Sequence, residues 1–181
     1  VGIKLGLLIS DEVLTESKRG KDHIATTWTL ARRKRAPWRW IPPAGLVTER
    51  GTAVRLRLSD ALSPLVESGF LERTVREHFE PLFDPRFDDL LGAHYPHGVR
   101  FEINGHEMVR VIADDADAAP LSIRLAGKRK PSASGYLVRS AVPLDEERSG
   151  VAISTFGKVI KRGWDWLGMM PAAADRTRGL I

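Results

Sequence analysis

The sequence has no cysteine among its 181 residues, which excludes a disulfide framework and a thiolate metal site. It has no apolar run near the roughly 20 residues that a bilayer-spanning helix needs, because the apolar stretch at 2–9 is too short. That stretch also lacks a small-residue cleavage site, so a secretory signal is not expected. There is no internal repeat and no long low-complexity segment. These absences favour a globular protein, for which we expect a cytoplasmic location.

Positive charge is concentrated in the first third of the chain. Between Lys18 and Arg57 there are eleven Lys and Arg residues against two acids, Asp22 and Glu49. From residue 60 to residue 91, three Arg residues stand against eight acids, so the local charge changes sign near residue 60. Opposite local fields indicate that the basic part, and not the whole chain, would meet a polyanion.

The residue pattern predicts an α+β fold, and strands dominate its first sixty residues. Residues 2–9 fit the end of a helix, and residues 11–18 and 23–33 fit two strands joined by a turn. Prolines make 34–50 a loop or an edge excursion. In 54–58, apolar residues alternate with arginines, which predicts a strand with its apolar side half-buried. That apolar side consists of Val54, Leu56 and Leu58.

Helices are expected after residue 60, and strands again after residue 98. Leu71, Val75, Phe79 and Leu82 form one apolar helical stripe. Asp84 and Pro85 fit an N-cap followed by Pro at the first helical position, and we expect Phe87, Leu90 and Leu91 to point inward. Asn104-Gly105 predicts a hairpin turn, and 121–125, 136–142 and 151–155 are strand candidates. We expect polar connectors at 114–119 and 127–134.

Two stretches resemble the GHKL superfamily of ATPases, which includes gyrase B, the 90-kDa heat-shock chaperone, histidine kinases and MutL. The first runs from Gly2-Ile3-Lys4 through a small helix and a long strand to Gly51-Thr52, which opens the last strand. The second is the strand–turn–strand at 150–160, which is similar to part of the adjoining transducer domain. The likeness is closest to bacterial ATPases related to the microrchidia (MORC) proteins.

This resemblance implies a partial Bergerat-type α/β sandwich in residues 1–60 and a truncated transducer-like α+β domain in 61–181. It implies ATP and Mg²⁺ as ligands of the intact parent, a homodimer, and a conformational change on nucleotide binding. Gly2 and Lys4 would lie at the phosphates, where a helix N-terminus presents unpaired N–H groups. Gly51 and Thr52 would lie at the adenine edge. The alternatives are a chain-end glycine, a solvated lysine and a plain strand threonine.

The residues that would perform hydrolysis are not matched in this sequence. The family's acidic base, its metal-binding asparagine and its Asp-x-Gly-x-Gly motif belong upstream of Val1, and no residue clearly matches the transducer lysine. Without them, water has no positioned base and the phosphate charge has no compensation. We therefore expect a fragment of a longer ATPase that is inactive by itself.

The basic, aromatic run at 32–40 is a separate candidate site. Guanidinium groups pair with phosphates and exposed Trp rings stack on bases, so a non-enzymatic module that binds nucleic acid such as DNA is the rival function. The alternative is a solvated loop in which Trp38 and Trp40 pack into the core around Pro42-Pro43. The candidate residues for an anionic partner are Arg32, Arg33, Lys34, Arg35 and Arg39.

The histidines do not predict a metal site. His94 and His97 have ligand-like spacing, but the intervening Tyr95-Pro96 and the following Gly98 favour a turn without a third ligand. Trp164 and Trp166 are expected to anchor the last hairpin by packing against it, and the alternative is that two exposed tryptophans mark a partner surface.

Overall fold

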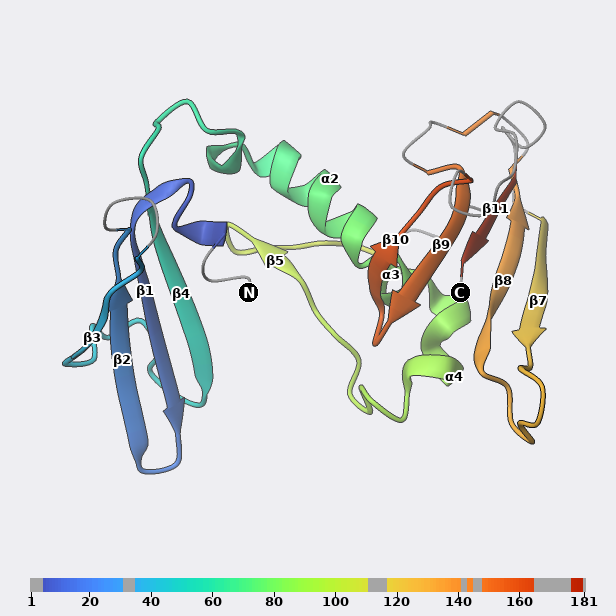
Figure 1. Ribbon diagram of the computed structural model, residues 1–181, viewed down its shortest axis with the longest axis horizontal. Helices are drawn as coiled ribbons and strands as arrows, with labels where there is room; N and C mark the ends of the chain where they lie inside the picture. The colour runs from blue at the N-terminus through green and yellow to red at the C-terminus, as the bar shows by residue number, and fades with distance from the viewer. Residues whose placement is uncertain are drawn as a thin grey trace. The chain divides into compact units, whose positions relative to one another are not determined.

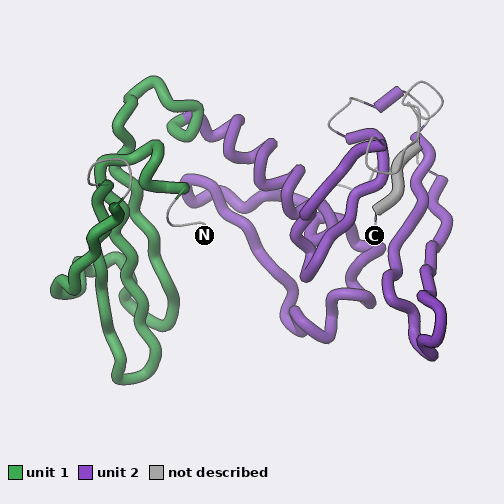
Figure 2. The backbone as a smooth tube through the Cα atoms, in the orientation of Figure 1, with its two compact units in different colours: residues 1–66 green, residues 67–181 purple. Residues whose placement is uncertain are grey.

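A computed structural model describes residues 5–30, 35–110, 117–140, 143–144, 148–164 and 177–180, the last of these by backbone alone. The chain divides into two compact units, residues 1–66 and 67–181 (Figure 2). Helical segments and small sheets occur together, an arrangement compatible with the predicted α+β class. Among the described strands the pairing is antiparallel except for one parallel pair, β9 with β11.

The first unit is a four-stranded antiparallel sheet with the strand order β3-β2-β1-β4 (Figure 1). Its strands are β1 (Ser10–Arg19), β2 (Asp22–Trp28), β3 (Trp38–Ile41) and β4 (Gly51–Leu58). The two strands predicted at 11–18 and 23–33 are confirmed as β1 and β2, although β2 ends at Trp28. The predicted edge excursion contains β3, which pairs with β2. A short 3-10 helix, η1 (Pro64–Val66), ends the unit.

The second unit begins with four short helical segments. These are α2 (Ser68–His78), α3 (Glu80–Phe83), η2 (Pro85–Phe87) and α4 (Asp88–Leu91). The predicted apolar stripe is interrupted, because Phe79 leaves the helical conformation with φ −121° and Pro81 lies in the first turn of α3. The N-cap prediction is confirmed, since the Asp84 side chain accepts a hydrogen bond from the Arg86 N–H at 3.0 Å. None of the helices within the described ranges is long and apolar enough to cross a membrane.

A five-stranded sheet with the order β10-β9-β11-β8-β7 completes the second unit. Its strands are β7 (Asp117–Ile123), β8 (Ala133–Arg139), β9 (Gly150–Thr155), β10 (Lys158–Lys161) and β11 (Thr177–Leu180). The small hairpin β5 (Glu102–Ile103) and β6 (His106–Glu107) turns at Asn104-Gly105, both with positive φ, as predicted. The prediction of a polar connector at 114–119 is wrong from Asp117 onward. Cross-strand pairing with β8 holds those residues extended.

Helical segments cover this second sheet and form a core with it. Phe87 of η2 packs with Val138 and Ala152, and Leu91, Tyr136 and Val159 lie against this cluster. Leu90 does not point inward as predicted, because α4 is one turn long and leaves it on the exposed side. Gly157 lies in the turn between β9 and β10 with φ 75°, and a Cβ there would lie 2.6 Å from Leu82 Cγ. Glycine therefore lets the hairpin approach α3 closely.

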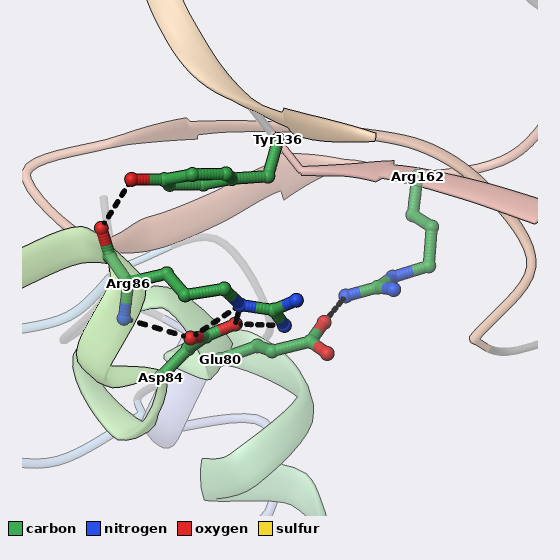
Figure 3. Close-up of polar contacts among 5 residues, drawn as sticks. All are labelled: Glu80, Asp84, Arg86, Tyr136 and Arg162. Carbon is green, nitrogen blue, oxygen red and sulfur yellow. Dashed lines mark hydrogen bonds and ion pairs between the residues drawn. The ribbon is translucent and has the colours of Figure 1, made fainter. Parts of the chain in front are cut away.

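Charged side chains fix the helical segments to the second sheet (Figure 3). Asp84 pairs with Arg86, with Nε–Oδ1 at 2.9 Å, and this pairing raises the pKa of Arg86. The Tyr136 hydroxyl donates to the Arg86 carbonyl oxygen at 2.8 Å. Arg162, which follows β10, pairs with Glu80 of α3. The four acidic and basic groups are all paired, which is the pattern of a structural network.

Candidate functional site

One face of the first sheet carries a continuous set of uncharged side chains. Directly opposed residues of neighbouring strands lie on the same face of a sheet, so the register defines its members. Three rows result: Trp38, Trp28, Val13 and Leu56; then Trp40, Thr26, Thr15 and Val54; then Ile24, Ser17 and Thr52. We call this the open face. None of these residues is acidic or basic.

Six of the eleven residues of the open face are exposed to solvent, four are half-buried, and Val13 is buried. Val54 retains 55% of its accessible surface and Leu56 38%, so the predicted burial is wrong for these two residues, whereas Leu58 is half-buried as predicted and the strand itself is confirmed. The turn after residue 6 covers one corner, where a Cβ on Gly6 would lie 3.2 Å from Leu56 Cδ2. Contiguous exposed apolar surface of this kind marks a contact site more often than a stable bare surface.

Two hydroxyl groups meet at one corner of the open face. Ser17 Oγ lies 2.8 Å from Thr52 Oγ1 across the β1–β4 pair. Gly51 precedes Thr52 at the start of β4, and its φ is not among the positive values. A Cβ on Gly51 would only reach ordinary contact, 3.8 Å from Val47 Cγ1. The fold therefore does not itself demand glycine at this position.

Three tryptophans form the opposite corner, which we call the tryptophan corner. Trp28 and Trp38 stack with ring centroids 5.9 Å apart and planes at 28°, and Trp40 lies edge-on to Trp38 at 5.3 Å. Trp38 is 50% exposed and Trp40 61% exposed. The alternative in which both rings pack into the core is therefore wrong. Because β3 is an edge strand, its rings have neighbours on one side only.

The other face of the sheet is closed by its own chain. The buried Glu16 carboxylate accepts hydrogen bonds from the N–H groups of Ala44 at 2.8 Å and of Leu46 and Val47 at 3.2 Å. His23 Nε2 lies 2.8 Å from Glu16 Oε1. Burial by itself raises the pKa of Glu16, but the bonds from His23 and the three N–H groups outweigh it and lower the pKa to about 2. An ionised carboxylate therefore fixes the 42–50 loop on this face.

The structure places only part of the predicted site. Gly51 and Thr52 lie together on β4, and Arg35 and Arg39 are exposed. Arg39 pairs with Thr27, so it lies on the face opposite to Trp38 and Trp40. The remaining predicted residues lie outside the described residues: Gly2, Lys4, Arg32, Arg33 and Lys34.

Three residues of this sheet were not predicted to matter: Glu16, Ser17 and Trp28. Ser17 follows Thr15 at a spacing of two in a strand, which was a sufficient signal that both share a face. The same period in Trp38-Arg39-Trp40 indicates that the arginine points away from both rings. Glu16 gave no such signal, because apart from His23 its partners are backbone groups of a loop about thirty residues later.

The second unit contains a pocket of about 470 Å³, whose charged lining is largely paired. Arg110 donates to Asp88 at 2.6 and 3.2 Å, and Arg100 lies 3.1 Å from Glu102, which is outside the lining. His94 packs edge-on against Phe156, with centroids 4.7 Å apart. Within the described ranges, no group of three or more His, Asp or Glu side chains is arranged to hold a metal ion. The pocket therefore offers no defined chemistry.

Comparison with models of known protein families gives no match, and comparison with curated protein sequences gives none.

Proposed function

We propose that this chain is part of an ATP-binding protein of the GHKL superfamily, related to the bacterial MORC-like ATPases. Residues 1–60 would form the C-terminal part of the ATP-binding domain and 61–181 a truncated, transducer-like domain. In the intact parent, binding of ATP with Mg²⁺ drives a conformational change. One observation carries this proposal: the Thr52 hydroxyl lies on an open, uncharged face, in a strand that Gly51 opens.

The chemistry of this corner suits the edge of a purine ring. A hydroxyl can donate and accept a hydrogen bond, and a purine edge offers both kinds of partner. Ser17 holds the Thr52 hydroxyl in one orientation at 2.8 Å, and Val54 and Ile24 supply apolar surface on either side. Such a site, apolar with a few placed polar groups, is typical of small-molecule recognition. The absence of carboxylates among the open-face residues also avoids repulsion of a triphosphate.

Gly51 gives independent support. The backbone conformation of Gly51 is one that any residue type can adopt, because its φ is not positive. A Cβ at this position would meet nothing closer than 3.8 Å. A glycine that the fold does not demand is consistent with close approach of a ligand to the backbone. The chain alone is expected not to hydrolyse ATP, because the proposal assigns the acidic base and the metal ligand to sequence upstream of Val1.

The test is to determine the encoded sequence upstream of Val1 and to measure ATP binding by the longer chain. The proposal requires a helix with Glu-x-x-x-Asn followed by Asp-x-Gly-x-Gly. In that chain, Thr52→Val should weaken ATP binding by roughly two- to tenfold, the value of one hydrogen bond. Thr155→Val is the matched control, since Thr155 is an exposed strand threonine of the second unit. Absence of both motifs would refute the proposal and favour the rival, a non-enzymatic module.

A further inference from the structure

The tryptophan corner is exposed beyond what the fold requires. Trp38 contacts both Trp28 and Trp40, yet Trp38 and Trp40 each keep half or more of their accessible surface. Large aromatic rings contribute most to stability when they are buried, so two half-open rings side by side indicate a surface kept for a partner. The hydroxyl group of Thr26, the residue opposite Trp40 on β2, already accepts from Trp28 Nε1 at 3.2 Å. The ring faces are therefore what this corner presents.

The charge of the first unit identifies the class of partner. Residues 1–66 contain twelve Lys and Arg against six Asp and Glu, whereas residues 67–181 contain sixteen against seventeen. The first unit thus carries +6 and the second −1. Arg35 precedes β3, Arg39 lies within it, and both are exposed, while the open face holds no carboxylate. A polyanion with flat, stackable groups matches this combination of charge and rings.

The edge position of β3 disfavours an added protein strand. The strand is four residues long and lies between Pro37 and Pro42-Pro43. Prolines lack the N–H that a neighbouring strand needs, and short edges flanked by proline resist sheet extension.

Bases in a duplex are already stacked on each other, whereas the bases of a single strand are free to stack on an indole ring.

We propose that the tryptophan corner binds single-stranded nucleic acid. Bases stack on the exposed faces of Trp38 and Trp40, and the phosphates follow the edge strand within reach of Arg35 and Arg39. Arg39 contacts the phosphates from the opposite face of the sheet. A sugar-phosphate backbone that runs along the edge strand can be reached by side chains of both faces, because successive side chains of a strand point to opposite faces. This site is separate from the Ser17–Thr52 corner, so it does not rest on the proposed nucleotide site.

The experiment is a fluorescence-anisotropy titration of the full chain with a labelled oligothymidylate of about 12 nucleotides. Trp40→Ala should weaken binding roughly tenfold, since stacking of one base contributes about 1–3 kcal/mol. Trp40→Phe should retain most of the affinity because every aromatic ring has a π-face, and it provides a folded variant should Trp40→Ala not fold. Phe156→Ala is the matched control, as Phe156 is 58% exposed in the second unit. Its affinity should equal that of the parent chain.

Three outcomes would overturn the proposal. The first is a duplex of the same length that binds as tightly as the single strand. The second is a folded Trp40→Ala variant that binds as the parent does. The third is a parent chain that sediments as a dimer, becomes a monomer in Trp40→Ala, and fails to bind the oligonucleotide. The titration contains no ATP, so its failure would leave the nucleotide proposal unaffected.

Discussion

The sheet of the second unit has helical segments on it and a shared apolar core, whereas the sheet of the first unit has a loop on one face and exposed apolar side chains on the other. Val138 in the second sheet is 1% exposed, and Val54 in the first is 55% exposed. Both are valines in strands, so residue type does not explain the difference. What differs is the covering layer and the position of the strand, because β4 lies at the edge of its sheet and β8 lies inside its own. The second unit shows that this chain buries apolar strand residues where its own elements reach them, which makes the open face of the first unit a candidate for contact with something else.

The hydrogen bonds from the 42–50 loop to Glu16, which we call the clamp, should give the largest effect when they are removed. Glu16→Ala removes the acceptor of three loop N–H groups, which lose their partners near the interior of the sheet. We expect the melting temperature of the first unit to fall by roughly 20 °C. Hydrogen exchange read by mass spectrometry reports each unit separately. Glu49→Gln, an exposed acid of the same loop region, should leave protection unchanged. A loss of protection confined to the second unit would contradict the clamp.

The polar network of the second unit should come next. Asp84→Ala removes the N-cap of η2 and leaves Arg86 without its carboxylate, which we expect to cost about 3 kcal/mol. Urea unfolding should show this loss in the second unit alone. Asp89→Ala is the control, because Asp89 is an exposed acid one helical segment later. Equal losses in both variants would show that Asp84 has no special role.

The same substitution in the two sheets tests the comparison directly. Val138→Ala opens a cavity in the core and should destabilise the second unit by about 2 kcal/mol. Val54→Ala removes exposed methyl groups and should change the stability of the first unit by less than about 0.5 kcal/mol. If Val54→Ala costs as much as Val138→Ala, the open face is covered in solution.

Acid should weaken the first unit through the same clamp. The pKa of Glu16 is about 2 in the folded state and 4.5 in the absence of its partners. Its stabilising contribution is therefore fully present above pH 4.5 and is lost as the pH falls toward 2. The free energy of unfolding measured between pH 5 and pH 2.5 should show this decline. Glu16→Gln does not titrate, so a decline of equal size in that variant would assign the effect to other groups.

The smallest effect is expected at the Ser17–Thr52 corner. Ser17→Ala removes the partner that orients the Thr52 hydroxyl, while both residues lie at the surface. Stability should change by less than about 0.5 kcal/mol, and ATP binding by the chain extended upstream should weaken two- to fivefold. Ser17→Thr keeps the hydroxyl and should restore the affinity. An unchanged affinity in Ser17→Ala, beside a loss in Thr52→Val, would remove Ser17 from the site without removing the site.

Local signals in the sequence were sufficient for much of the fold. Strands β1 and β2 were predicted because β-branched residues and a short polar turn occur together, and the Asn104-Gly105 turn because this pair tolerates positive φ. Asp84 was predicted as an N-cap from its position before Pro85. Each of these predictions depends on contacts within a few residues.

Non-local features were beyond such signals. Alternation in β4 separates two faces, but it does not say whether another layer covers either one, so Val54 was predicted to be half-buried and is exposed. Strand β11 lies between β8 and β9, and no local sequence pattern predicts this strand order. The candidate site was partly predictable, because Thr52 and the tryptophans were named. The pairing of Thr52 with Ser17 required the register.

The bond between Glu16 and the loop also sets the order in which the first sheet can be completed. The carboxylate lies in β1, and its most distant N–H donor, that of Val47, is 31 residues later. A hairpin of β1 and β2 alone contains His23, one partner of Glu16, but none of the three loop N–H donors. The sheet also needs β4 (Gly51–Leu58) as the second neighbour of β1, so the loop donors and the last strand follow one another in the chain and both must be present before the sheet is complete.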